Sequence, residues 1–436
     1  MPKQLKLERK SMKNIVILVG VIASIATSMA YAQSRPREET LADILKEAVA
    51  QHPSITSRQS EREASRFDLE SAKWGRYPTL SASVETVKGG MQTLASIQQP
   101  LWTGGRMTGQ IDLATASESM SGANVAEAEL EILKQTSAVY FEIMRLESRL
   151  NSAKSNVAEH LKLLETIQRR VSVEVSPITD ETQANTRFHQ AVTERIHIER
   201  QLADAHNALE QLLGRPAPSI APPNAINLEP RTQVSLKQAA VAYSPVRKRL
   251  AAQVEKSGAE IKLARAQIMP TLYAGYETVL GTLHSGQDRD RAYVALRAES
   301  GSGFSKMSAS KAAVARKQAA QDAINVFDRE LAQQVTASWI EAKALEQQVK
   351  PARDTLVGAD EIVASYLRQF QVGKKTWLDV LNAQREKANS QAALADIEAM
   401  LMMAKVRLLI LAGEINAVSA EVLNGQVLNG QVLSGR

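Results

Sequence analysis

The sequence predicts a mainly α-helical protein with a small β part, built from two copies of one long helical hairpin. Apolar residues from Leu345 to Phe370 recur at alternating steps of four and three, which is the seam of a coiled coil. The same spacing runs from Leu146 to Val171, 199 residues earlier, and only His160 interrupts it with a polar side chain. Before each seam, apolar and polar residues alternate over two short segments, as they do along β-strands. The chain is therefore expected to be an internal duplication.

The composition favours long helices and excludes several kinds of site. Of 436 residues only 4% are aromatic, and glycine and proline are few. The absence of cysteine rules out disulfides, thiolate metal sites and cysteine nucleophiles. The formal charge is +6, but five basic residues and one acidic residue among residues 1–32 contribute +4 of it, which leaves +2. Because the remainder has no basic patch, nucleic acid is not expected as a partner.

Residues 1–32 are predicted to be a signal peptide for export. Basic residues at positions 3–13 precede an apolar run from Ile15 to Ala26, and Ala30-Tyr31-Ala32 offers small residues where a signal peptidase cuts. The alternative is an N-terminal transmembrane anchor, which is less favoured because serine and threonine shorten the apolar run. No later stretch is apolar enough to predict a membrane helix.

Residues 33–214 form the first predicted repeat. A short helix ends before Pro53, and a longer one runs from about Ile55 to Tyr77. A β hairpin at about 79–102, a long helix at about 107–171 and a return helix at about 180–213 follow. At 1.5 Å per residue the long helix would measure about 100 Å, which is more than a globular domain spans.

Residues 235–413 form the second predicted repeat, with a β hairpin at about 271–299 and long helices at about 306–371 and 379–411. Pro351 is expected to bend the first of these helices or to loosen one of its turns. A proline-rich linker at 215–234 joins the repeats. Residues 414–436 contain a repeated pentapeptide and are predicted to form a flexible tail.

The residues that break helices repeat as regularly as the seams do. Pro53 and Pro245 lie 192 residues apart, whereas Gly104 and Gly303, which follow the two β segments, lie 199 apart. The seven extra residues of the second repeat therefore lie between these points and are placed in its β hairpin.

The predicted strands have the length that crosses a bilayer, about 9–11 residues. Unpaired strand edges are not tolerated in lipid, so spanning strands must close into a barrel. Two hairpins per chain cannot close one alone, and several copies would have to pool their strands. The alternative is a soluble hairpin packed on a helix.

Two short motifs carry a resemblance to a known family. Residues 372–381 read Val-Gly-Lys-Lys-Thr-Trp-Leu-Asp-Val-Leu, which is similar to the family's Val-Gly-x-x-x-x-x-Asp-Val-Leu helix tip. Residues 99–106 read Gln-Pro-Leu-Trp-Thr-Gly-Gly-Arg, which is similar to its strand-to-helix signature. With the duplicated order of elements, the chain resembles the TolC family of outer-membrane exit ducts over about residues 38–413.

The resemblance implies an assembly and a location. The chain would form a homotrimer in the outer membrane of a Gram-negative bacterium. Four strands per protomer would make a 12-stranded β-barrel in outer-membrane lipid, and the helical hairpins would make a trimeric α-barrel across the periplasm. A periplasmic adaptor (membrane fusion) protein would dock on the hairpin tips and link the duct to an inner-membrane ABC or proton-driven pump.

The resemblance also places an entrance ring at the start of the last helix. Asp379 matches the family's axial aspartate, and three copies of a carboxylate around a pore would attract cations. The position one turn further on, often a second acid in the family, is Asn382, so a double ring is not expected. Asp379 could instead serve only to cap the helix, because acids are favoured near helix N-termini.

Two further sets of tip residues follow from the resemblance. A latch that holds the tips closed would use Asp180 and Lys375, whereas Phe370 lacks the hydroxyl that the family's latch uses. Lys375 could also be an ordinary solvated lysine. The adaptor-docking tip would comprise Val372, Gly373 and Lys374 in the second repeat, and Val173 and Glu174 in the first. Gly373 could be present only because a tight turn requires it.

No catalytic, cofactor-binding or metal site is predicted. Gly373-Lys374-Lys375-Thr376 is not a phosphate loop, because such a loop needs glycine where Arg368 stands and a preceding strand. The six histidines lack metal-ligand spacing. We therefore expect a passive exit duct, for type I protein secretion or small-molecule efflux, and not an enzyme. The alternative function is a periplasm-spanning coiled-coil structural or interaction protein without a pore.

Overall fold

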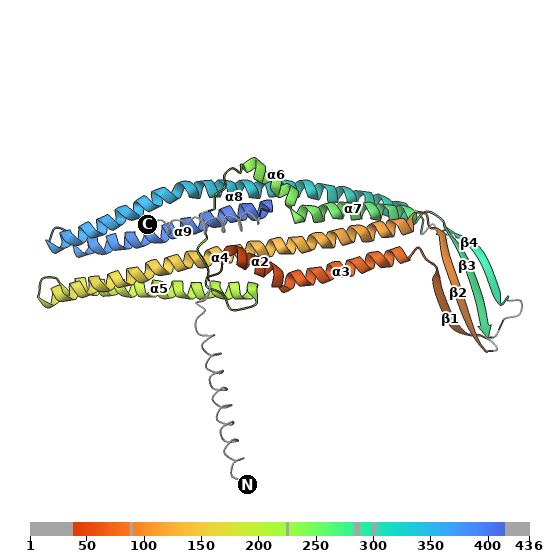
Figure 1. The fold of residues 1–436 in the computed structure, drawn as a ribbon, viewed down its shortest axis with the longest axis horizontal. Helices are drawn as coiled ribbons and strands as arrows, with labels where there is room; N and C mark the ends of the chain where they lie inside the picture. The colour runs from red at the N-terminus through yellow and green to blue at the C-terminus, as the bar shows by residue number, and fades with distance from the viewer. Residues whose placement is uncertain are drawn as a thin grey trace, which may run out of the picture.

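A computed structural model describes residues 38–414, apart from 88–89, 224–225, 282, 284–287, 299–301 and 304. The predicted signal peptide, 1–32, and residues 415–436 of the predicted tail lie outside the described residues. The molecule is a long rod of helices with a small sheet at one end (Figure 1). None of the described helices has an apolar stretch long enough to cross a membrane.

The two repeats contain the same elements in the same order. Both long helices have 67 residues, and both return helices have 36. The first repeat consists of α2 (Leu41–Gln51), α3 (Pro53–Trp74), β1 (Thr79–Val87), β2 (Gly90–Trp102), α4 (Arg106–Ser172) and α5 (Ile178–Leu213). The second consists of α6 (Gln233–Tyr243), α7 (Pro245–Ala266), β3 (Thr271–Gly281), β4 (Asp290–Arg297), α8 (Ser305–Gln371) and α9 (Trp377–Ala412).

Helices α2 and α6 end before Pro53 and Pro245, as expected, and these prolines also begin the next helices. Pro53 and Pro245 are the first residues of α3 and α7, where a proline loses no helical hydrogen bond because its missing N–H would be unpaired. His52 and Ser244 cap these helices from the preceding position. Accordingly α3 begins at Pro53 and not near Ile55, and it ends at Trp74, before Tyr77.

The four strands form one antiparallel sheet in the order β1-β2-β3-β4, so pairing of β2 with β3 joins the two hairpins. The register places most of the apolar residues on one face, and a polar row, Ser81, Ser96, Glu277 and Arg291, on the other together with Leu94 and Val279. Within the described residues, β1 and β4 have no partner strand on their outer edges. The apolar face is open to solvent in a single chain, through Leu80, Val84, Ile97, Leu280, Val294 and Leu296.

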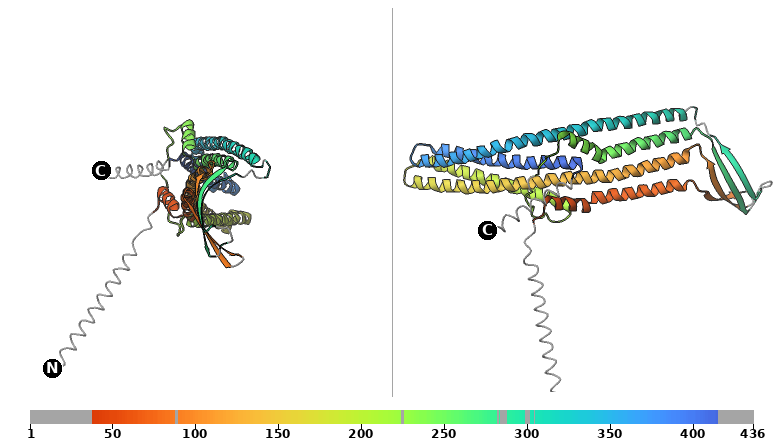
Figure 2. Two further views of the ribbon diagram at one scale, coloured as in Figure 1. Left: turned by 90° about the vertical axis from the view of Figure 1, so that its right-hand side faces the viewer. Right: turned by 45° about the horizontal axis from the view of Figure 1, so that its top comes forward.

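The hairpins α4–α5 and α8–α9 lie side by side along the rod (Figure 2). Helix α4 contacts α3, α5, α7 and α9, so it joins the two repeats. The main core lies at mid-length, where α2 and α6 cover the long helices and Tyr140, Phe141 and Leu209 are buried. The end of the rod opposite the sheet has a second, smaller core.

The proline-rich segment 215–234 is packed against this mid-length core. Ile220, Ile226 and Leu228 bury their side chains in it. The guanidinium of Arg215 pairs with Glu39 at 2.7 Å and with Glu47 at 2.6 Å, which ties the segment to α2. The connection between the repeats is therefore a folded part of the molecule, and α6 already begins within it at Gln233.

A bend or a loosened turn was expected at Pro351, and α8 continues through this proline without interruption. Proline removes one N–H and so leaves the carbonyl of Gln347 without its helical partner. Both residues are exposed, so water can satisfy that carbonyl. The hydroxyl of Thr355 donates to the Pro351 carbonyl at 2.8 Å, and the ladder resumes one turn later.

Candidate functional site at the hairpin tips

The two tips close with the same backbone geometry. In each, an N–H donates back to the carbonyl three residues earlier, from Glu174 to Val171 at 3.0 Å and from Gly373 to Phe370 at 3.1 Å. Both donors have left-handed backbones, with φ of 60° at Glu174 and 72° at Gly373. Glutamate pays a steric cost of about 1–2 kcal/mol in this conformation that glycine does not pay. The first tip is therefore the more strained of the two.

Asp379 lies at the third residue of α9 and closes a capping box with Thr376. The backbone N–H and the hydroxyl of Thr376 donate to the Asp379 carboxylate at 2.9 and 2.8 Å, and the Asp379 N–H donates back to that hydroxyl. These bonds to the ionised form hold the pKa of Asp379 below its usual range, so the side chain stays charged. The helix thus begins two residues before Asp379, and the Thr-x-x-Asp spacing is the sequence signal that indicates it.

The acid at the matching position of the first tip has different surroundings. Pro177 replaces Thr376 there, and α5 has no side-chain cap. Asp180 therefore lacks the hydroxyl that fixes Asp379. Asn382 is exposed three residues after Asp379 and lies on the same helical face.

The predicted latch residues have other partners within one chain. The ammonium of Lys375 lies 4.3 Å from the centre of the Tyr366 ring, a cation–π contact, and no ion pair joins it to Asp180 in the described part of the chain. Phe370 is 7% exposed, and its ring packs against Trp377 at 5.2 Å. The guanidinium of Arg170, from the other hairpin, lies 4.7 Å above the Phe370 ring. Phe370 is therefore a contact between the hairpins.

Phe370 belongs to a separate apolar core that holds the two tips together. The first hairpin contributes three aliphatic residues of α4 and one alanine of α5, and the second contributes the residues around its turn. The buried members of this core, which we call the tip cluster, are Leu163, Leu164, Ile167, Ala184, Phe370, Trp377, Val380 and Leu381.

The predicted docking residues are exposed at the very end of the rod. Val372 is 69% exposed and Val173, at the matching position, is 66% exposed. Lys374 and Glu174 are exposed beside them. Three further apolar side chains, Val175, Ile178 and Leu378, enlarge this apolar tip surface.

Ion pairs between the hairpins were not indicated by the sequence. The ammonium of Lys387 on α9 contacts Glu159 of α4 at 3.0 Å and Asp360 of α8 at 2.7 Å. Arg145 of α4 donates to Asp396 of α9 at 2.9 Å. Hydrogen bonds to Glu142 of the same helix and to Asp396 raise the pKa of Arg145 above its usual value. The two pairs that join the hairpins show no distinctive spacing, because Glu159 and Lys387 lie 228 residues apart in the chain, and Arg145 and Asp396 lie 251 apart.

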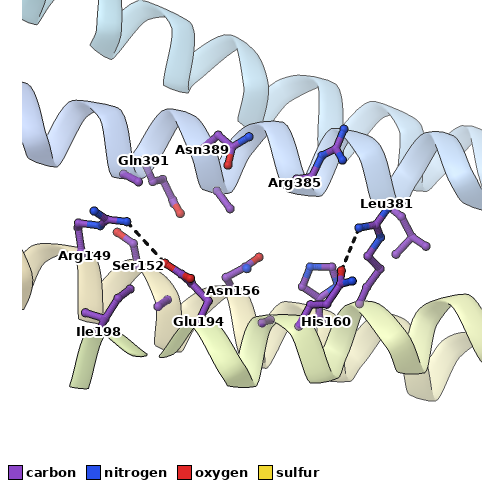
Figure 3. Close-up of a pocket in the computed structure, with 16 residues that line it drawn as sticks. Arg149, Ser152, Asn156, His160, Glu194, Ile198, Leu381, Arg385, Asn389 and Gln391 are labelled. Atoms are coloured by element: carbon purple, nitrogen blue, oxygen red, sulfur yellow. Dashed lines mark hydrogen bonds and ion pairs between the residues drawn. The ribbon is translucent and has the colours of Figure 1, made fainter. Parts of the chain in front are cut away.

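A groove of about 290 Å³ lies beside the tip cluster, with α4 as its floor and α5 and α9 as its walls (Figure 3). His160 of the α4 seam is 5% exposed and lines this groove. Its Nδ1 atom is buried without a hydrogen-bond partner in the described residues. Burial lowers the pKa of His160, and the charge of Arg187 acts in the same direction, whereas Glu159 opposes it.

Comparison with known proteins identifies related chains. A family profile described as "Outer membrane efflux protein" matches residues 44–215 and 236–414, which coincide with the two repeats. The outer membrane efflux protein BepC of Brucella suis is 21% identical over 326 residues, 74% of this chain and 72% of BepC. The cobalt-zinc-cadmium resistance protein CzcC of Cupriavidus metallidurans is 23% identical over 400 residues, 86% of this chain and 93% of CzcC.

A solved structure shares the fold. The outer membrane protein VceC of Vibrio cholerae matches with a TM-score of 0.74 and 18% identity, over 86% of this chain and 96% of VceC.

Relief of the strain at the first tip should slow local opening there. We expect Glu174→Gly to stabilise the closed turn by about 1 kcal/mol. Glycine removes the strain of the left-handed backbone, but part of this gain is lost because glycine loses more conformational entropy on folding. Hydrogen exchange of the peptide that contains Val175 should then slow about fivefold. Gly373→Ala should speed exchange at the second tip, by strain alone, because a Cβ there meets no atom within 4 Å. Equal exchange in wild type and Glu174→Gly would show that the turn is unstrained.

Titration of His160 should make the protein less stable in acid. Because folding lowers the pKa of His160, the unfolded chain takes up a proton below about pH 6.5 that the folded chain does not, so stability falls as the pH drops. We expect His160→Leu to raise stability at pH 7 by about 1 kcal/mol, by removing an unpaired buried polar group. It should also flatten the decline in the urea midpoint between pH 7 and 5. His189→Leu, at an exposed position of α5, should keep the wild-type decline. An unchanged decline in His160→Leu contradicts this assignment.

Proposed function

The chain belongs to the outer membrane efflux protein family, and on that basis we propose that three copies form one passive conduit from the periplasm to the cell exterior. As a member of this family it is an outer-membrane exit duct that extends into the periplasm. The trimer, the ring at its entrance and the adaptor at its tips are parts of the proposal. Transport would be driven by an inner-membrane pump, with no catalysis by this chain.

The sheet supports assembly from several copies. Its outer edges, β1 and β4, run in opposite directions, so β4 of one copy can pair antiparallel with β1 of the next. Two copies would give eight strands, and a barrel of that size is filled by its own side chains. Three copies give 12 strands, the smallest closed set with room for an aqueous lumen. Three is also the number that the family resemblance implies.

The exposed apolar face of the sheet is the observation that carries the proposal. In a closed barrel the face with Leu80, Val294 and Leu296 would contact lipid, and the polar row with Glu277 and Arg291 would line water. A poreless coiled-coil protein would have no use for such a face, which is costly in water. The sheet therefore favours the duct over that alternative.

Asp379 is proposed as the entrance ring. Its carboxylate stays ionised because Thr376 donates two hydrogen bonds to it, and one oxygen atom takes both of these bonds. The second oxygen is left to act on passing ions. Around a threefold axis, three such carboxylates would attract cations. Capping and ring formation are thus compatible roles for one side chain.

The apolar tip surface is proposed as the docking site of a periplasmic adaptor protein. Apolar side chains gathered at an exposed extremity mark interaction sites, and here Val372 and Val173 are at equivalent positions of the two tips. For the cargo we favour small molecules over proteins, because the matched family and BepC carry efflux in their descriptions.

Removal of the charge at Asp379 should weaken cation preference. In planar bilayers under a salt gradient, Asp379→Asn should shift the reversal potential towards zero, because the ring loses three charges while the amide oxygen can still accept from Thr376. Asp180→Asn removes the matching carboxylate of the other tip and should leave the reversal potential nearer to wild type. An identical reversal potential in wild type and Asp379→Asn would contradict the assignment of Asp379 to the entrance ring.

Site-directed cross-linking can identify the docking partner, because the chain has no cysteine of its own. Lys374→Cys places one thiol on the exposed second tip, and a thiol–amine reagent should capture a periplasmic adaptor in cells. Mass spectrometry would then show whether the adaptor is encoded with an ABC transporter or with a proton-driven pump. Ser148→Cys, exposed on α4 away from the tips, is the control and should capture less adaptor. Equal capture at both positions would mean that the tip is not the docking surface.

A further inference from the structure

The groove beside the tip cluster combines an open shape with a concentration of arginine. Helices α5 and α9 hardly touch each other, so side chains of α4 form a floor between them. Arg149 comes from this floor, Arg187 from the α5 wall and Arg385 from the α9 wall. Glu194 is the single acidic residue that lines the groove.

Only one of the three arginines is neutralised. Arg149 lies 3.6 Å from Glu194 and 3.9 Å from Asp396. Arg187 donates to the neutral amide of Gln190 at 2.9 Å. Among the residues that the structure describes, neither Arg187 nor Arg385 has a carboxylate within ion-pair distance. The groove thus keeps two uncompensated positive charges on opposite walls.

The floor also contains polar atoms that lack partners. The Nε–H of Arg149 and the Nδ1 atom of His160 are buried without a hydrogen-bond partner within the described ranges. Buried polar groups in native proteins are almost always paired with protein, water or a ligand. The remaining lining is rich in amides and hydroxyls, from Gln190 and from Ser152, Asn156, Asn389 and Gln391 (Figure 3).

We propose that this groove is a binding site for a small oxyanion, a phosphate or a carboxylate, held between Arg187 and Arg385. Guanidinium groups present planar forks of N–H donors that match the oxygens of such anions. The groove volume of about 290 Å³ holds the anion together with several of its waters, each of which takes about 30 Å³ in the liquid.

The bound anion would act as a bridge between the two hairpins. Arg187 belongs to the first repeat and Arg385 to the second, and direct contact between their helices is sparse. One anion that accepts hydrogen bonds from both would replace mutual repulsion of the two cations with attraction to a shared partner. This function goes beyond conduction, and a failure of the site would leave the duct proposal intact.

Calorimetric titration of the full-length protein in detergent tests the site, with inorganic phosphate and acetate as the two probes at constant ionic strength. We expect one saturable site per chain for at least one probe. Arg385→Gln should raise its dissociation constant at least tenfold, and Arg187→Gln together with Arg385→Gln should abolish binding. Arg385→Lys keeps the charge but loses the fork, so it should give an intermediate constant.

Arg368→Gln is the matched control, because it removes one exposed arginine of α8 outside the groove. The dissociation constant of this variant for the anion should equal that of wild type, which distinguishes a specific site from general attraction to positive charge. Saturation by acetate alone would identify the ligand as a carboxylate, and by phosphate alone as a phosphate. Absence of binding by both anions in wild type, or equal binding in wild type and Arg385→Gln, would overturn the proposal.

Discussion

The burial of one apolar seam along each very long helix is the interaction on which the rest of the molecule depends. An isolated helix gains little from its own hydrogen bonds in water, so helices of 67 residues persist only because they pack on neighbours throughout. Packing of α5 on α4 and of α9 on α8 fixes the two tips at one end, and α3 and α7 steady the other end below the sheet. Because both long helices have equal length and both return helices do as well, the two tips lie at the same end of the rod (Figure 1).

Local chemistry made much of this architecture predictable from the sequence. The seams, the turn glycines and the duplicated prolines are short-range signals, and each acts through its own backbone or helical face. The expectations that the structure corrects are also local ones, and they concern prolines. Helix α2 ends before Pro53 as expected, but α3 begins at Pro53 itself and not near Ile55, because His52 offers a cap. Pro351 was expected to bend α8 or to loosen a turn, but the helix continues through it, and water can reach the carbonyl that it leaves unpaired. In both cases the missing proline N–H costs little, because that N–H has no partner at a helix start and because water reaches the exposed carbonyl inside α8.

The candidate site was predictable in its residues and not in its contacts. Sequence spacing places Asp379 near a helix start, but only the structure shows its carboxylate bonded to Thr376. The sequence indicated only that Phe370 lacks the hydroxyl of the family's latch. In the structure its ring packs under the guanidinium of Arg170, which belongs to the other hairpin. How one hairpin is rotated against the other decides these contacts, and periodicity within a single helix carries no information on that rotation. The roles of the ring, latch and docking residues stay predictions.

The difference between the two tips limits how a partner can be arranged. A threefold assembly would present six tips of two alternating kinds. One kind has a strained turn at Glu174 and a return helix that begins at Pro177 without a side-chain cap, and the other has a relaxed turn at Gly373 and a return helix that Thr376 caps. Such an end has approximate sixfold shape but only threefold chemistry. A partner with three subunits could meet three identical pairs of tips, whereas one with six identical subunits would have to recognise two environments with the same surface. The gene duplication has therefore doubled the number of contacts without doubling the number of equivalent ones.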